Sequence, residues 1–510
     1  SYRDFALTRI KAEQPSVLWV ASNDSLLHAV KADDGTPLMS YLPSPLMGGL
    51  RAASAESTKD IVATMDGSPV TADVYVGEGA SGAWKTYLFS SLGRGGRAIF
   101  ALDVTDPKTE ALNEDHAANV FKWMFSAEDD GDLGYVLVDP VVHRASGQPS
   151  QVVRLNTGRF ALMTPNGYGS SSGVAALFFL DVQGRQSDGT WGGGRVKKLV
   201  AKASDSGNGM MGATWVDIDN NGTADWVYAT DLKGQLWKFD ISSSDMTKWA
   251  SSFVDGAANA PMFQAQSGAS GSGDPLPITT APVVTFPGMG GVMIGFGTGK
   301  SIVAGDFPNT SQTQRFYSIW DRGNFGPASV GTPGAADSIR AMPTHASLLG
   351  RKLLRNTETG AVTFDEDSEA ATINWNDQDG WYLDFPVTPG QDVGTGEMVL
   401  STPVVRSGIL FFTTVWPDSS GEDRCQTDPF ASLYAVSPTG GSVVKGLLPS
   451  GVGMSVSDSK VLVVLDQTVG KEVDEESLRI IPPRDDDISL KAPTSSGRVQ
   501  WRVIPGLKTH

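Results

Sequence analysis

The stretch DWVYATDLKGQLWKFD, residues 225–240, contains two short apolar runs separated by the residues DLKG. Valine, tyrosine, tryptophan and phenylalanine are enriched in β-strands, and aspartate and glycine are typical of the turns between strands. The second run, Leu236-Trp237-Lys238-Phe239-Asp240, places an aromatic residue after an aliphatic one and ends in aspartate. The stretch therefore predicts two neighbouring strands joined by a turn.

The second run recurs along the chain as a phrase: an aliphatic residue or Phe, then an aromatic residue or His, any residue, and another apolar residue. The copies start at residues 27, 99, 177, 236, 316, 381 and 433, so neighbouring starts are 52 to 80 residues apart. The other copies are Leu27-His28-Ala29-Val30, Ile99-Phe100-Ala101-Leu102-Asp103, Leu177-Phe178-Phe179-Leu180-Asp181, Phe316-Tyr317-Ser318-Ile319, Leu433-Tyr434-Ala435-Val436 and the looser Trp381-Tyr382-Leu383-Asp384. Such self-similarity indicates a repeat architecture.

A second apolar run precedes most copies, such as VLWVAS before the first and RFALMT before the third. A unit of two strands and a turn cannot bury both of its faces alone, whereas units arranged around an axis cover one another and protect their edges. We therefore expect an all-β fold, a β-propeller. Because the repeats are longer than typical blades, we also expect long loop insertions and a few short helices. A β-sandwich array with accidental similarity is the alternative.

The domain organisation expected from this pattern is a single β-propeller domain over residues 1–510. The polar segment 471–496, which contains Arg484-Asp485-Asp486-Asp487, is expected to be an exposed connection. The best helical pattern runs from Thr109 to Phe125, after Pro107, and we expect a helix there as an insertion between strands.

The charge balance limits the partners that this chain can have. Its 510 residues include 40 Lys and Arg against 57 Asp and Glu, a formal net charge of −17, and the acidic residues are spread along the chain. This composition argues against nucleic acid as a partner, because nucleic acid requires a basic surface.

Cys425 is the single cysteine, so an intramolecular disulfide, a zinc ribbon and a CxxC redox pair are all excluded.

The sequence has no run of about 18 apolar residues, the length that spans a bilayer, so we expect no transmembrane segment in it. It also begins without methionine and without a recognisable signal peptide. We therefore expect it to be a fragment from which the targeting information has been removed.

Acidic and amide side chains gather just before the opening stretch, in TWVDIDNNGTAD at residues 214–225. Counted from Asp217 as position 1, oxygen donors occupy positions 1, 3, 5 and 9, glycine occupies position 6, and position 7 can offer its backbone carbonyl. Hard oxygen donors around a glycine turn favour Ca²⁺ over a transition metal. The expected ligands are Asp217, Asp219, Asn221, Thr223 and Asp225.

This loop differs from an EF-hand, which has a glutamate at position 12 and a helix after the loop. Here Tyr228 occupies position 12, and the surrounding residues predict a strand. The form D-x-D-x-N-G-x-x-D resembles the calcium loops of β-hairpins in integrin-type propellers. A hydrated turn without a metal is the alternative.

A second acidic stretch contains Asp129, Asp130 and Asp132. It lacks the alternating spacing of oxygen donors, and we expect it to be a solvated loop rather than a second ion site.

Several longer phrases occur in a fixed order along nearly the whole chain. They include NDSLLHAVKADDG (23–35), WKTYLFSSLGRGGRAIFALDVTDP (84–107), GYGSSSGVAALFFLDV (167–182), WVDIDNNGTADWVYATDLKGQLWKFDI (215–241), FGTGKSIVAGD (296–306) and STPVVRSGILFFTTVWP (401–417). Each phrase alone is weak, but their joint order is specific. The chain resembles the C-terminal propeller domain of the PilY/PilC family, the type IV pilus biogenesis factors and tip-associated adhesins.

This resemblance implies a modified, quinoprotein-like propeller, for which we expect seven blades, with one Ca²⁺ in the loop of residues 217–225. It also implies a non-enzymatic role: the domain would regulate the balance between pilus extension and retraction, and would act in twitching motility, surface attachment, cell adhesion and virulence. The implied location is the cell surface or pilus tip of a Gram-negative bacterium, in association with the outer membrane. The implied partners are pilus subunits (minor pilins) and host-cell or abiotic surfaces.

The chain departs from the family pattern in two respects. Many members carry a cysteine pair before the phrase that begins at residue 433, whereas Cys425 stands alone here, so a disulfide in that loop is excluded. The sequence also has no RGD tripeptide, so integrin attachment is not expected of it.

Two other functions compete with the calcium-dependent one. The first is a pyrroloquinoline-quinone-dependent dehydrogenase, because those enzymes are propellers with similar strand phrases and a calcium ion. Such enzymes typically hold the quinone with a vicinal disulfide ring, which one cysteine cannot form. The second is a purely structural pilus component without a regulatory ion.

Overall fold

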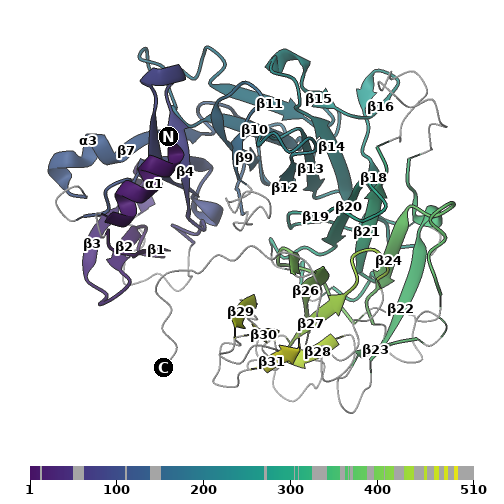
Figure 1. Cartoon of the computed structure of the whole chain (residues 1–510). Helices are drawn as coiled ribbons and strands as arrows, with labels where there is room; N and C mark the ends of the chain where they lie inside the picture. The colour runs from purple at the N-terminus through teal and green to yellow at the C-terminus, as the bar shows by residue number, and fades with distance from the viewer. Residues whose placement is uncertain are drawn as a thin grey trace. The chain divides into compact units, whose positions relative to one another are not determined.

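The structure of the chain is a computed structural model, drawn in Figure 1. It describes residues 1–11, 14–49, 63–108, 112–137, 151–268, 273–303, 305–307, 309–323, 342–355, 362–365, 367, 371–386, 395–406, 408–417, 430–441, 453–456, 465–469, 476–480 and 488–491. These residues divide into two compact units. The first holds residues 1–229 and 237–260, and the second holds residues 230–236 and 261–491.

Antiparallel sheets built from consecutive strands make up most of the first unit (Figure 1). A three-stranded sheet contains β1 (Val17–Ala21), β2 (Leu27–Lys31) and β3 (Pro37–Tyr41). Two four-stranded sheets follow: β4 (Val70–Val76), β5 (Ala83–Ser91), β6 (Ala98–Asp103) and β7 (Phe121–Ser126), then β8 (Val152–Arg154), β9 (Phe160–Pro165), β10 (Ala176–Asp181) and β11 (Val196–Val200). The next sheet contains β12 (Met210–Val216), β13 (Trp226–Asp231), β14 (Gln235–Asp240) and β15 (Ala250–Ser251), and a short hairpin pairs β16 (Val254–Asp255) with β17 (Ala258–Asn259).

The sheet of β8–β11 buries both of its faces against neighbouring sheets. On β10, Phe178 and Leu180 belong to one buried cluster, shared with the sheet of β4–β7. Leu177 and Phe179 belong to another, shared with the sheet of β12–β15. Side chains on a strand alternate between its two faces, so the apolar phrase serves two cores at once. This double burial explains why the phrase is apolar at consecutive positions instead of alternating with polar residues.

The second unit contains one ten-stranded sheet and one three-stranded sheet among its described residues. The ten-stranded sheet has the order β19-β20-β21-β24-β22-β23-β28-β27-β26-β25, and the other has the order β29-β30-β31. The strands of these two sheets are β19 (Val283–Thr285), β20 (Val292–Gly297), β21 (Arg315–Asp321), β22 (Leu349–Arg355), β23 (Val362–Phe364), β24 (Gly380–Asp384), β25 (Val404–Arg406), β26 (Ile409–Trp416), β27 (Phe430–Val436), β28 (Gly453–Val456), β29 (Leu465–Val469), β30 (Glu476–Ile480) and β31 (Ile488–Lys491). The short strand β18 (Phe263–Gln264) belongs to neither sheet and pairs with Gln235 and Leu236 of β14. Stacked rings mark its core: the Phe412 ring lies 4.1 Å from Phe316 and 4.8 Å from Tyr434, centroid to centroid.

The repeated phrase lies on strands, as predicted, at all seven places. Five copies occupy the third strand along the chain of a β-meander, namely β6, β10, β14, β21 and β27. The first copy lies on β2, the middle strand of its sheet, and the looser copy lies on β24, which pairs with β21. The predicted preceding runs also form strands, which are β1, β9, β13, β20 and β26.

The helix expected from Thr109 to Phe125 is wrong for most of that range. Within its described part, residues 112–125, only a 3₁₀ turn at Glu114–His116 (η4) and one α-turn at Ala117–Val120 (α3) are helical, and β7 begins at Phe121. Trp123 and Phe125 are both buried and point to the same side of β7, where they pack in the core. Burial of these rings on a strand outweighs the local helical spacing.

Helices are few and short among the described residues, as expected. The longest is α1 (Tyr2–Lys11), which the sequence analysis missed. The other 3₁₀ turns are η1 (Ser44–Leu46), η2 (Gly79–Ser81), η3 (Gly93–Gly95), η5 (Met246–Lys248) and η6 (His345–Ser347). Within the ranges that the structure describes, none of these helices has the length and hydrophobicity required to cross a bilayer.

Two expectations on organisation stay predictions. The single domain over residues 1–510 is not tested by the division into two compact units, because each unit is described by itself. Strands β30 and β31 lie within the segment 471–496, which was expected to be a connection. Residues 484–487 and Cys425 lie outside the described residues.

Candidate metal centre and the pocket beside it

The acidic loop of residues 217–225 connects β12 to β13 in the first unit. It brings together the carboxylates of Asp217, Asp219 and Asp225, which offer one oxygen each within 4.8 Å of one another. Asp225 is buried, Asp217 is partly buried and Asp219 is exposed. The cluster therefore lies at the surface with one side set into the protein.

Backbone N–H groups hold the carboxylates in place. Asp217 accepts hydrogen bonds from the N–H of Asn221 at 3.1 Å and from the N–H of Gly222 at 2.8 Å. Asp219 also accepts from the N–H of Asn221, at 3.1 Å. The chain turns back sharply because Asn220 and Gly222 have positive φ angles, 60° and 84°. Glycine at position 222 suits this conformation, which most side chains disfavour.

The other two predicted ligands, Asn221 and Thr223, bond to each other. The side-chain oxygen of Asn221 accepts the Thr223 N–H at 2.8 Å, and the Thr223 hydroxyl donates to it as well. The same hydroxyl lies 2.8 Å from the side-chain oxygen of Asn156. The Asn221 oxygen thus already takes part in the turn through two hydrogen bonds from Thr223.

Asn156 is a part of this site that the sequence analysis missed. It lies in the turn between β8 and β9, and its amide donates to Asp225 Oδ1 at 3.2 Å and to the Ala224 carbonyl at 2.9 Å. The Ala224 N–H donates in turn to the Arg154 carbonyl at 2.9 Å. The β8–β9 turn therefore packs directly on the acidic loop. No local pattern marks Asn156, because its partners lie nearly 70 residues away in sequence.

We predict that Asn156→Ala weakens Ca²⁺ binding by about tenfold or more, the usual effect of removing a group that orients a ligand. The reason is that Asp225 loses the amide that fixes one of its oxygens. Calorimetric titration of Ca²⁺ would measure the change. Asn113→Ala, at an exposed asparagine away from the loop, is the matched control and should bind as the wild type does. Equal affinity in both variants would contradict a positioning role for Asn156.

The charges in this loop are not balanced by the protein. Among the described residues, no Lys, Arg or His forms an ion pair with Asp217, Asp219 or Asp225. Two carboxylates about 5 Å apart repel each other by about 3 kcal/mol at an effective dielectric constant of about 20. The arrangement is therefore costly unless a cation is shared between the three groups.

The second acidic stretch is built differently, and it is not the simple solvated loop that was expected. Asp129 pairs with Arg185 at 2.6 Å, and Asp130 and Asp132 both pair with Lys198 at 2.8 Å. Burial favours a higher pKa for Asp132, but hydrogen bonds from Lys198 and Ser172 outweigh it, so the pKa lies below its usual value. Two protein cations thus offset most of the charge of these three acidic groups.

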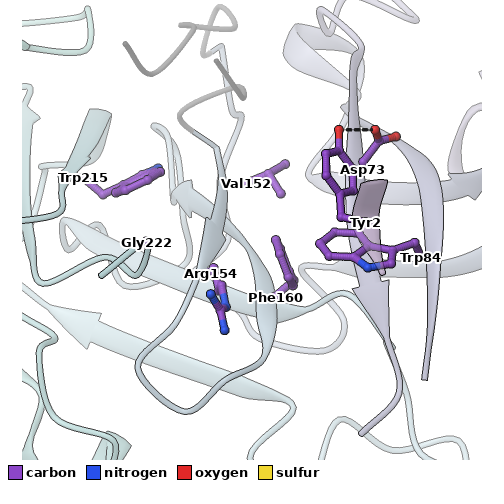
Figure 2. Close-up of a pocket in the computed structure, with 8 residues that line it drawn as sticks. All are labelled: Tyr2, Asp73, Trp84, Val152, Arg154, Phe160, Trp215 and Gly222. Atoms are coloured by element: carbon purple, nitrogen blue, oxygen red, sulfur yellow. Dashed lines mark hydrogen bonds between the residues drawn. The ribbon is translucent and has the colours of Figure 1, made fainter. Parts of the chain in front are cut away.

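A pocket of about 170 Å³ lies beside the acidic loop, within the first unit (Figure 2). It is lined by Tyr2, Asp73, Trp84, Val152, Arg154, Phe160, Trp215 and Gly222. Gly222 belongs to the loop, and a Cβ added to it would lie 3.8 Å from Arg154 Nη1. The loop and the pocket therefore share a wall.

Comparison with known proteins identifies a family and several relatives for this chain. The model of the family described as PilY1 beta-propeller domain matches residues 1–340. The Type IV pilus biogenesis factor PilY1 of Pseudomonas aeruginosa is 31% identical over 549 residues, which cover 99% of this chain and 43% of that protein. A Type IV pilus biogenesis factor PilY1 homolog of Xylella fastidiosa is 30% identical over 458 residues, which cover 88% of this chain and 27% of that protein. The chain spans less than half the length of these relatives.

The crystal structure of the P. aeruginosa PilY1 C-terminal domain has the same fold as this chain. The TM-score is 0.69 at 24% sequence identity, over 97% of this chain and 96% of that one. The chain belongs to the PilY1 β-propeller domain family. The all-β propeller predicted from the repeated phrase is confirmed, and the β-sandwich alternative is rejected. The count of seven blades stays a prediction.

Proposed function

We propose that this propeller domain binds one Ca²⁺ in the loop of residues 217–225 and acts in a type IV pilus biogenesis factor without catalysing a reaction. The observation that carries the proposal is the convergence of Asp217, Asp219 and Asp225, with no cation of the described chain paired to them. A divalent ion would remove most of their mutual repulsion. The loop's position between two buried strands would transmit the ion's effect to the sheet.

The donor set fits a calcium ion. Each oxygen of the three carboxylates accepts one hydrogen bond from the loop or from Asn156, and so retains a second acceptor direction for an ion. The Asn221 oxygen and the Thr223 carbonyl are the further donors expected from the sequence. Six to eight oxygen ligands in a flexible arrangement are what Ca²⁺ prefers, so waters would complete the shell.

The chain's own residues determine what the ion would do. Asp225 is buried and its second oxygen accepts the Ile218 N–H at 2.9 Å, so the cluster ties the two ends of the loop together. An ion that binds the folded loop alone stabilises the fold by about 2.7 kcal/mol at a free concentration 100 times its dissociation constant. Calcium would thus order the connection between β12 and β13.

The names of the relatives support the biological half of the proposal, since both are type IV pilus biogenesis factors. We place the domain at the cell surface or pilus tip of a Gram-negative bacterium, in contact with minor pilins and with host-cell or abiotic surfaces. There its calcium state would favour pilus extension over retraction, and so control twitching motility, adhesion and virulence. Calorimetric titration of Ca²⁺ into the domain tests the ion site on which this role depends.

The quinone-dependent dehydrogenase remains the rival from another class, and we predict that the domain does not use this cofactor. Incubation with pyrroloquinoline quinone and Ca²⁺ should leave no bound quinone absorption after desalting and should give no dye-linked alcohol oxidation. Retained quinone together with dye reduction would overturn the non-enzymatic assignment. The purely structural alternative is separated by the same calcium titration, because it requires no ion.

A further inference from the structure

We propose that the pocket beside the acidic loop binds an aromatic ring that carries a carboxylate, as in the C-terminal residue of a peptide that ends in phenylalanine or in a free aromatic acid. The pocket's size, its aromatic walls and the guanidinium of Arg154, which has no partner among the described residues, point to this ligand. None of these features is needed for calcium binding, so the site adds a ligand to the domain.

The size and the walls suit one aromatic ring. The volume of about 170 Å³ is close to the cavities of about 150 Å³ that hold benzene in other proteins. The Trp84 ring lies 4.7 Å from the Tyr2 ring and 5.6 Å from the Phe160 ring, centroid to centroid, and Trp215 forms another wall (Figure 2). Aromatic rings favour tilted and edge-to-face contacts of this kind with a further ring.

Sheet register puts the cation next to these walls. Arg154 on β8 pairs directly with Phe160 on β9, so both side chains lie on the same face of the sheet. Val152 is two residues before Arg154 and lies on that face as well. The strand therefore places Arg154 beside the ring site.

Arg154 is available for an anion. It is exposed, and within the described parts of the chain its side chain has no hydrogen bond or ion pair. Asp73, on the opposite wall, is already engaged, because it accepts from the Tyr2 hydroxyl at 2.9 Å and from the Thr86 hydroxyl at 2.6 Å. A guanidinium binds a carboxylate with two parallel hydrogen bonds, which makes a carboxylate the best-matched partner.

The shared wall predicts a link between this ligand and calcium, and this link rests on the proposed function. Without an ion the loop carries three carboxylate charges next to Arg154, and they repel a second anion there. A bound Ca²⁺ would cancel two of the three charges. We therefore expect the ligand to bind several-fold tighter in Ca²⁺ than in a chelator, and Ca²⁺ to bind tighter by the same factor when the ligand is present.

Titrations monitored by saturation-transfer NMR test the proposal with N-acetyl-L-phenylalanine and with its C-terminal amide as probes. We expect the acid to bind the wild-type domain and the amide to bind about tenfold or more weakly, because it lacks the charge that Arg154 pairs with. Arg154→Gln should lower the affinity for the acid to that of the wild-type domain for the amide. Lys248→Gln removes an equal charge from an exposed site elsewhere in the first unit and should change nothing.

Two further arms separate the sources of the ligand. The peptide Gly-Ser-Gly-Phe is compared with its amidated form and with Gly-Phe-Ser-Gly. If Gly-Ser-Gly-Phe binds tighter than N-acetyl-L-phenylalanine, the ligand is a peptide terminus. If the two bind equally, the ligand is a free aromatic acid. Binding of the amide as tight as the acid, or an unchanged affinity in Arg154→Gln, would overturn the site. Equal affinity in Ca²⁺ and in chelator would overturn only the link to calcium, and a separate calcium titration decides the proposed function.

Discussion

Calcium titration of this domain is expected to show one binding site in the wild type and none in Asp217→Ala or Asp225→Ala. Each substitution removes one of three carboxylates that offer oxygens within 4.8 Å of one another. Loss of one charged ligand from a site with few others takes away both coordination and most of the electrostatic attraction for a divalent cation. Isothermal titration calorimetry at low ionic strength gives the stoichiometry directly.

One control and one further variant make this prediction specific. Asp34→Asn removes one negative charge from an exposed turn of the same unit and should leave the titration unchanged. Asp219→Asn keeps the shape of an exposed ligand, so it weakens binding without any effect on the buried part of the loop. Circular dichroism of each variant checks the fold. One site of unaltered affinity in both alanine variants would exclude the loop as the ion site.

Bacteria that carry Asp217→Ala or Asp225→Ala in the full-length protein are expected to lose most of their twitching motility while the protein is still made and folded. The reason is that the calcium state of the loop would set the balance between pilus extension and retraction. Twitching zones on agar and electron microscopy of surface pili measure the two parts of this balance. Asp34→Asn is again the matched control, because it changes the net charge by the same amount.

The outcome of the cell experiment is informative in both directions. If calcium binding is abolished in the purified domain and twitching falls, the ion has a regulatory role. Normal twitching and normal surface piliation in cells whose protein no longer binds Ca²⁺ would leave the ion as a structural element, and would contradict the regulatory half of the proposal.

Much of the fold could be predicted from the sequence because its signal is local and repeated. The phrase at Leu177-Phe178-Phe179-Leu180 is apolar at consecutive positions because alternate side chains enter two different cores. The helix predicted for Thr109–Phe125 was wrong because the spacing of its apolar residues fits a helix as well as a strand. Only the packing of Trp123 and Phe125 in the core, which is a long-range effect, decides between the two.

The carboxylates of the candidate site could be predicted from the sequence, but the residues that pack against them could not. Asp217, Asp219 and Asp225 are eight residues apart at most, so the loop itself reveals them. Asn156 and Arg154 reach the same place from another hairpin, through a parallel bridge between Leu155 and Ala224. No pattern in a single sequence encodes such a contact. The pocket was missed for the same reason, because its walls come from α1 and five separate β-strands besides the loop.

The most direct test of the central claim is a crystal structure of the domain grown in Ca²⁺, with anomalous data collected to identify the ion. We predict one calcium peak in the loop, with oxygens of Asp217, Asp219 and Asp225 at about 2.3 to 2.6 Å from it. A loop that contains only water, with its carboxylates turned apart in saturating Ca²⁺, would contradict the account.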